Sequence, residues 1–195
     1  MVEAVTSALR RLPPLLLLIA LLVFPASGLA HRLDEYLQAT LVVIEPDSVR
    51  LQINLTPGVE VADKVLALID RDHDGVISKS EEAGYAELLK RDLIVRLDEH
   101  DVAIKLIAST FPELAELRAG LGIMQVEFSV TSTGLAAGAH KLTLENRHQS
   151  AVSVYLINAA KPKSGTVQIT AQKRNQNQAS GEIGFTIEPI ATSAR

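Results

Sequence analysis

The stretch LQATLVVIEPDSVRLQINL, residues 37–55, decides which fold class the sequence predicts. Its first part, Leu37 to Ile44, is rich in β-branched residues and ends at the turn sequence Glu45-Pro46-Asp47-Ser48. Its second part, Val49 to Leu55, alternates apolar and polar residues, as a strand does when one of its faces is buried. The stretch therefore predicts a β-hairpin with one face in a core.

Further strand-like segments follow at short intervals and are separated by Gly, Ser, Asn and Pro. We expect them at residues 93–97, 102–107, 123–130, 141–144, 152–157, 166–171 and 182–187. This spacing predicts an α+β fold that is mainly an antiparallel β-sandwich, with an EF-hand helix–loop–helix inserted at about residues 57–92. We expect one β-rich domain over residues 31–190 and a frayed tail over 191–195.

Two amphipathic helices are expected within the insertion. The first should begin at Thr56-Pro57, because Thr can cap a helix and Pro is tolerated in its first turn. Its buried face is predicted to hold Val61, Val65, Leu68 and Ile69. The second should begin near Ser78, where Ser78 and Glu81 fit a capping box, and should bury Tyr85, Leu88 and Leu89.

The segment between these helices, DRDHDGVISKSE at residues 70–81, matches the EF-hand pattern at every diagnostic position. Calcium prefers six to eight oxygen ligands, which such a loop supplies from alternate positions. Gly75 permits the sharp turn, and Ile77 is expected to face the core. The predicted ligands are Asp70, Asp72, Asp74, the backbone carbonyl of Val76, Ser78 directly or through water, and Glu81 with both oxygens.

The alternative for this loop is a solvated acidic turn, in which the three Asp side chains would repel one another. Calcium is therefore favoured, and magnesium is the weaker candidate because its smaller octahedral shell does not need a bidentate Glu. Only one such loop is present, whereas sensor EF-hands usually act in pairs. This favours a structural ion, with a sensor as the alternative.

Residues 1–30 are predicted to be a secretory signal peptide. Arg10 and Arg11 precede an apolar run from Leu15 to Phe24, and Gly28-Leu29-Ala30 offers small residues at a cleavage site. The alternative is an uncleaved membrane anchor, for which this run is short. After cleavage the protein is expected to span no membrane and to be periplasmic or secreted.

Composition narrows the function classes. The 195 residues include no Cys, which excludes thiol catalysis, Cys-bound zinc and disulfides. A formal net charge of −4 does not attract phosphate backbones, so nucleic acid is not an expected partner. The sequence contains no G-x-S-x-G, H-E-x-x-H or phosphate-binding glycine loop, so an enzyme is not expected. A hydrolase whose site is invisible in the sequence stays an alternative.

The run His31-Arg32-Leu33-Asp34-Glu35-Tyr36-Leu37-Gln38, followed by the hairpin and the acidic loop, resembles exported bacterial EF-hand proteins of uncharacterised function. More distantly, it is similar to the periplasmic N-terminal region of nickel/cobalt-exporter-like and HupE/UreJ-type proteins. The resemblance implies an exported protein of Gram-negative type and suggests a membrane permease as a partner. The chain departs from the transporter pattern because no transmembrane helices follow the domain.

The expected function is therefore that of a non-enzymatic, exported calcium-binding protein, acting as an interaction or accessory domain with a mainly structural Ca²⁺. The alternative is a periplasmic accessory protein for nickel, cobalt or copper handling. It would use His31, whose imidazole and free amine could chelate such metals after cleavage.

Overall fold

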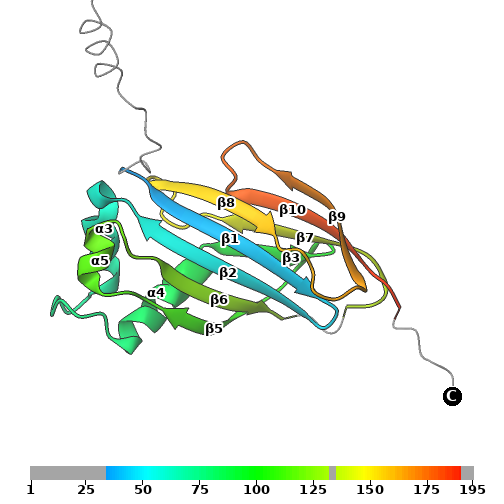
Figure 1. Cartoon of the computed structure of the whole chain (residues 1–195), viewed down its shortest axis with the longest axis horizontal. Coiled ribbons are helices and arrows are strands. Elements are labelled where there is room, and N and C mark those ends of the chain that lie inside the picture. Colours follow the sequence, from blue (N-terminus) through cyan, green and yellow to red (C-terminus); the bar gives the residue numbers. More distant parts are fainter. Residues whose placement is uncertain (1–33, 132–134, 190–195) are drawn as a thin grey trace, which may run out of the picture. The chain divides into compact units, whose positions relative to one another are not determined.

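The protein is described here by a computed structural model that covers residues 34–131 and 135–189 (Figure 1). The chain divides into two units between His31 and Arg32, and the fold that follows belongs to the second unit. The predicted signal peptide, His31 and the predicted tail lie outside the described residues.

The first sheet is built around the predicted hairpin, which is confirmed. Strands β1 (Tyr36–Glu45) and β2 (Ser48–Pro57) pair antiparallel with Glu45 opposite Ser48, so the turn lies at Pro46-Asp47. Inward-facing positions along β2 are buried and the positions between them are more exposed, as the alternation predicted. Strands β5 (Ile104–Thr110), β6 (Met124–Val130) and β8 (Ser153–Ala159) complete the order β5-β6-β2-β1-β8.

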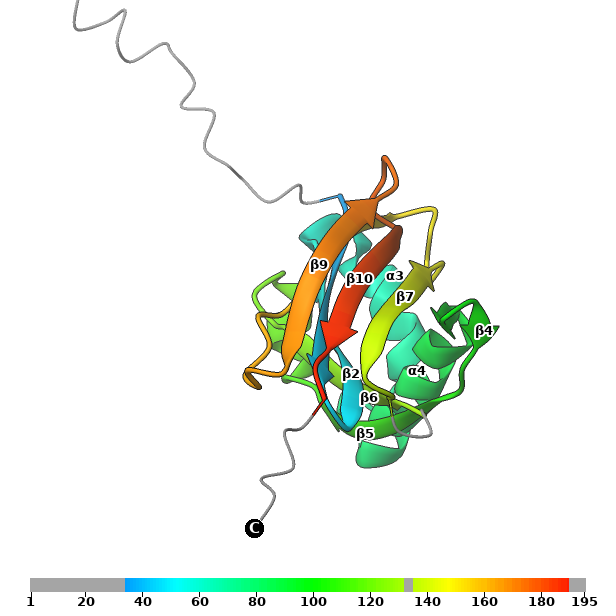
Figure 2. The ribbon, with the colours of Figure 1, turned by 90° about the vertical axis from the view of Figure 1, so that its right-hand side faces the viewer.

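The second sheet is antiparallel throughout, in the order β4-β3-β7-β10-β9. Its strands are β3 (Leu93–Leu97), β4 (His100–Asp101), β7 (Gly138–Asn146), β9 (Val167–Arg174) and β10 (Ser180–Ile187). Figure 2 shows β9, β10 and β7 side by side, with the strands of the first sheet behind them. The prediction of a mainly β, sandwich-like α+β fold is confirmed at this level.

One strand pair departs from the antiparallel prediction. Strand β8 runs parallel to β1, with Leu41 opposite Asn158. The reason is that β7 ends in the second sheet and residues 147–152 carry the chain across to the first sheet, where the Tyr36 N–H donates to the Val152 carbonyl at 2.7 Å. Strand β8 therefore enters beside the start of β1 and follows its direction.

Two helices lie between β2 and β3, as predicted, but the first begins later than expected. Thr56 and Pro57 still belong to β2, because both pair with β1 in the ladder. Helix α3 (Val59–Ile69) therefore begins after Gly58, which gives it no side-chain cap. Helix α4 (Lys79–Arg91) begins after Ser78, and the predicted capping box with Glu81 is present. A short helix, α5 (Leu114–Arg118), was not predicted.

The helices close the sandwich at one side. Helix α4 contacts both β5 of the first sheet and β3 of the second, whereas α3 contacts β2 and α5. The predicted faces are confirmed, because Val61, Val65, Ile69, Tyr85 and Leu89 are buried and Leu68 and Leu88 pack against the core. Burying one such aliphatic side chain contributes about 1.5–3 kcal/mol. Among the described residues, no helix is both long and apolar enough to cross a membrane.

Candidate metal centre

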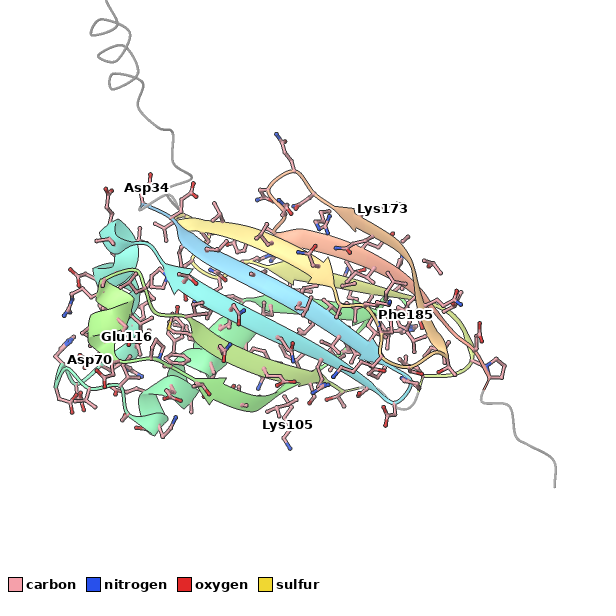
Figure 3. All side chains as sticks on the ribbon, in the orientation of Figure 1. Asp34, Asp70, Lys105, Glu116, Lys173 and Phe185 are labelled. Carbon is pink, nitrogen blue, oxygen red and sulfur yellow. The ribbon has the colours of Figure 1, made fainter. Side chains whose placement is uncertain are left out.

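The acidic loop joins the two helices directly. Asp70 follows the last residue of α3 and donates its N–H to the Leu66 carbonyl at 2.9 Å. Ser78 directly precedes α4, and its hydroxyl accepts a hydrogen bond from the Glu81 N–H in the first turn of that helix. Figure 3 labels Asp70 at the end of the domain where the helices lie. The loop is thus fixed at both ends by helices that pack on the sandwich.

Three of the predicted ligands come together. Asp70, Asp72 and Asp74 each present a carboxylate oxygen, and these three oxygens lie within 4.8 Å of one another. The loop backbone holds the carboxylates in place: the Gly75 N–H donates to Asp70 and the Asp74 N–H to Asp72, both at 3.2 Å. All three side chains offer only oxygen, which is the donor atom that hard cations such as calcium prefer.

The Asp70 carboxylate carries the strongest indication of a ligand. Asp70 is 8% exposed, and its Oδ1 atom is buried without a hydrogen-bond partner. Among the buried side-chain oxygens and nitrogens of the described residues, only Thr40 Oγ1 shares this condition. Thr40 is uncharged and lies in a strand of the core. A buried carboxylate oxygen without a partner is costly, and the same carboxylate belongs to the group of three clustered Asp side chains.

The turn of the loop depends on two residues with left-handed backbone. Gly75 has a φ of +82°, and His73 has a φ of +61°. The Gly75 conformation is open to glycine and strained for most side chains, which agrees with the predicted role of this residue. The His73 side chain is exposed, and Ile77 packs against the core as predicted.

The Glu81 carboxylate closes the base of the loop. It accepts hydrogen bonds from the Arg71 N–H at 2.8 Å, the Ser78 N–H at 2.9 Å and the Ser78 hydroxyl at 2.8 Å. The bonds from Ser78, and then that from Arg71, lower the pKa of Glu81 to about 2. Glu81 lies outside the group of three Asp oxygens. The ligand roles of Val76, Ser78 and Glu81 stay predictions.

The charges at the helix ends favour a cation in this loop. The C-terminal end of a helix carries partial negative charge, which a nearby positive group offsets. Helix α4 has Lys90 and Arg91 in its last turn, whereas α3 has no basic residue there and runs directly into the three Asp side chains. A cation bound by these carboxylates would supply the positive charge that α3 lacks.

A second polar cluster involves Tyr85, on the buried face of α4, and Asp92, which directly follows the helix. The His148 ring is fully buried, and its Nδ1–H donates to Asp92 at 2.7 Å while its Nε2 accepts from the Tyr85 hydroxyl at 2.9 Å. The Tyr36 hydroxyl in turn donates to the Tyr85 oxygen at 2.7 Å. Burial lowers the pKa of His148, although the bond to Asp92 opposes this, and this shift favours the neutral ring. The His148 ring has no surface exposed to solvent.

A third polar group lies at the start of β7. His140 donates from Nδ1 to the Asp98 carboxylate at 2.7 Å and from Nε2 to the Ala136 carbonyl at 2.8 Å. Both partners can only accept, so the two bonds form together only when the ring is protonated as an imidazolium. The bond to Asp98 is the main reason that the pKa of His140 is raised.

Sequence reasoning missed both histidine clusters. Neither His140 nor His148 showed a metal-binding spacing, and the partners of His148 lie 56 and 63 residues away in the chain. The chain matches no family model, no curated protein and no solved structure.

Proposed function

We propose that this chain is an exported, non-enzymatic calcium-binding protein, in which the loop from Asp70 to Glu81 is an EF-hand that holds one Ca²⁺ in a mainly structural role. The observation that carries the proposal is the buried, unpartnered Oδ1 of Asp70 among three clustered carboxylates. Buried polar atoms in proteins normally have a hydrogen-bond partner. A bound cation would satisfy this oxygen by coordination, without a hydrogen-bond donor.

The residues that would hold the ion are Asp70, Asp72 and Asp74, together with Val76, Ser78 and Glu81. The first three already converge, and the loop backbone positions them. Calcium supplies positive charge between them and so removes their mutual repulsion. No nitrogen ligand belongs to the group, which favours a hard cation over nickel, cobalt or copper.

A structural role follows from where the loop lies. Its first ligand ends α3 and its last two begin α4, and α4 contacts an edge of each sheet. An ion bound in the loop would therefore fix the angle between the helices that close the sandwich. The loop contains four carboxylates, and an exported protein meets a high calcium concentration. A dissociation constant of about 10⁻⁴–10⁻³ M would therefore be low enough for the site to be filled.

The direct test is a calorimetric titration of the EDTA-treated protein with CaCl₂. We expect one ion per chain, and weaker binding of MgCl₂. Asp70→Asn keeps the shape of the side chain but removes its charge, and it should weaken calcium binding by about tenfold or more, since the site loses a charged ligand.

The matched control is Asp47→Asn, which makes the same charge change in the exposed β1–β2 turn. It should bind calcium as the wild type does. Equal loss in both variants, or no binding heat in the wild type, would remove the proposal.

A further inference from the structure

The outer face of the first sheet contains a hollow of about 510 Å³. Residues from all five strands line it, and all of them belong to the described part of the chain. In Figure 1 this face is turned to the viewer, and no helix lies in front of its middle strands. The volume falls in the range of roughly 300–1,000 Å³ that is typical of small-ligand sites.

Strand register places the polar side chains of the hollow in its centre. One cross-strand row runs from Ala39 on β1 through Asn54 on β2 and Gln125 on β6 to Thr110 on β5. The neighbouring row runs from Leu41 through Gln52 and Glu127 to Ala108. Amide and carboxylate groups therefore occupy β2 and β6, and small or aliphatic side chains lie on each side of them.

The central amides are free to bind a ligand. Among the contacts of the described residues, the side chains of Gln52, Asn54 and Gln125 make no hydrogen bond. Glu127 is the charged residue of the lining, and its charge is offset by Arg50, which pairs with it at 3.0 Å beside the hollow. Each free amide offers both donors and an acceptor.

We propose that this face binds a neutral carbohydrate. Sugar hydroxyls both donate and accept, which matches the amides of Gln52, Asn54 and Gln125. The apolar C–H face of a sugar ring would lie on Leu41, which is 38% exposed, and on Ala39. The lining contains no aromatic side chain for stacking, so binding should be weak, with a dissociation constant on the order of 10⁻³ M.

Other ligand classes fit this surface less well. A neutral hollow does not attract a phosphate backbone or a charged peptide. A peptide strand cannot add to the sheet at this place, because β1, β2 and β6 are each paired on both edges. These two observations favour a carbohydrate over a peptide or a nucleic acid.

The test is an NMR titration of the purified ¹⁵N-labelled protein with maltohexaose, cellohexaose and chitohexaose in turn. Side-chain NH₂ signals report directly on the amides. We expect at least one of these sugars to shift the NH₂ signals of Gln52, Asn54 and Gln125 in a saturable way. The signal of Gln168, an exposed amide on β9 of the other sheet, should not move.

The double variant Asn54→Ala/Gln125→Ala should weaken binding by tenfold or more, while Gln168→Ala should have no effect. The proposal is overturned if none of the sugars shifts the three amides, if Gln168 shifts equally, or if a neutral Ser/Thr-rich peptide shifts the amides and the sugars do not. The titration is run in EDTA, so its outcome is independent of calcium binding in the loop.

Discussion

Two polar clusters lie along helix α4, and they differ in whether their buried polar atoms all have hydrogen-bond partners. At its start, the loop gathers three carboxylates whose oxygens can only accept, and Asp70 Oδ1 has no donor. Toward its other end, the buried side chains of His148, Tyr85 and Tyr36 form a hydrogen-bonded chain that ends on the partly exposed Asp92, and every donor in it meets an acceptor. The first cluster leaves a buried acceptor without a partner, whereas the polar atoms of the second are paired with one another.

This difference supports the proposal that the loop binds an ion, whereas the second cluster is a structural network. A fully satisfied buried network stabilises one arrangement of the chain and needs no ligand. The polar side chains next to this network are hydrogen-bonded as well: Gln38 donates to the His148 carbonyl at 2.8 Å and accepts from Asn146 at 2.8 Å. An excess of acceptors, by contrast, is destabilising until a positive ion arrives. Substitutions in the two clusters should therefore have opposite consequences.

The largest effect is expected in the complete cluster. Tyr85→Phe leaves the Nε2 of His148 and the hydroxyl of Tyr36 without their shared partner, both of them buried. Leaving a buried polar group unsatisfied costs about 1–3 kcal/mol, and the free energy of unfolding should fall by that amount in urea denaturation. A loss that appears only in the presence of calcium would contradict the comparison.

A smaller effect of different sign is expected in the loop. In EDTA, Asp70→Asn reduces the repulsion among three carboxylates and keeps an oxygen to accept from the Gly75 N–H. The free energy of unfolding should stay equal or rise by up to about 0.5 kcal/mol, as for removal of a like-charge neighbour. Urea denaturation in EDTA measures this, and a fall of more than about 1 kcal/mol would mean that the Asp70 carboxylate is itself structural.

The smallest effects are expected from His140 in β7 and His148 just after it, which should respond to pH in opposite directions. The raised pKa of His140 means that its contribution is complete below the unfolded value of about 6.5 and is lost as pH rises through the folded pKa. The lowered pKa of His148 means that its contribution is complete above about 6.5 and is lost as pH falls through the folded pKa.

NMR titration of the two rings measures both pKa values, and Asp98→Asn should bring that of His140 down. Since the Asp98 side chain is 45% exposed, the effect on stability should be small. A His148 that titrates above His140 would contradict the charge states assigned to the two rings.

Local patterns in the sequence predicted much of the fold. The hairpin, the capping box at Ser78 and Glu81, and the buried faces of both helices depend on residues close in the chain, where spacing carries the signal. The parallel pairing of β8 with β1 depends on where the chain crosses between sheets, which no short pattern encodes. Helix α5, with five residues, is too short for a helical period to be recognised.

The candidate metal centre was accessible to the same reasoning because its residues are consecutive. The EF-hand spacing placed Asp70, Asp72 and Asp74 together, and their convergence agrees with it. The hollow on the first sheet was not predicted, because Asn54 and Gln125 are distant in the chain and meet only through strand register. The start of α3 was misplaced because Thr56-Pro57 suits the end of a strand as well as the beginning of a helix.

The measurement that tests the central claim most directly is thermal unfolding of the wild-type protein in EDTA and in about 10 mM calcium. For a dissociation constant of about 10⁻⁴ M, binding adds about 2.7 kcal/mol, which should raise Tm by roughly 5–10 °C for a chain of this length. Asp70→Asn should lose most of this rise, and Asp47→Asn should keep it. The same Tm in EDTA and in calcium would contradict the account.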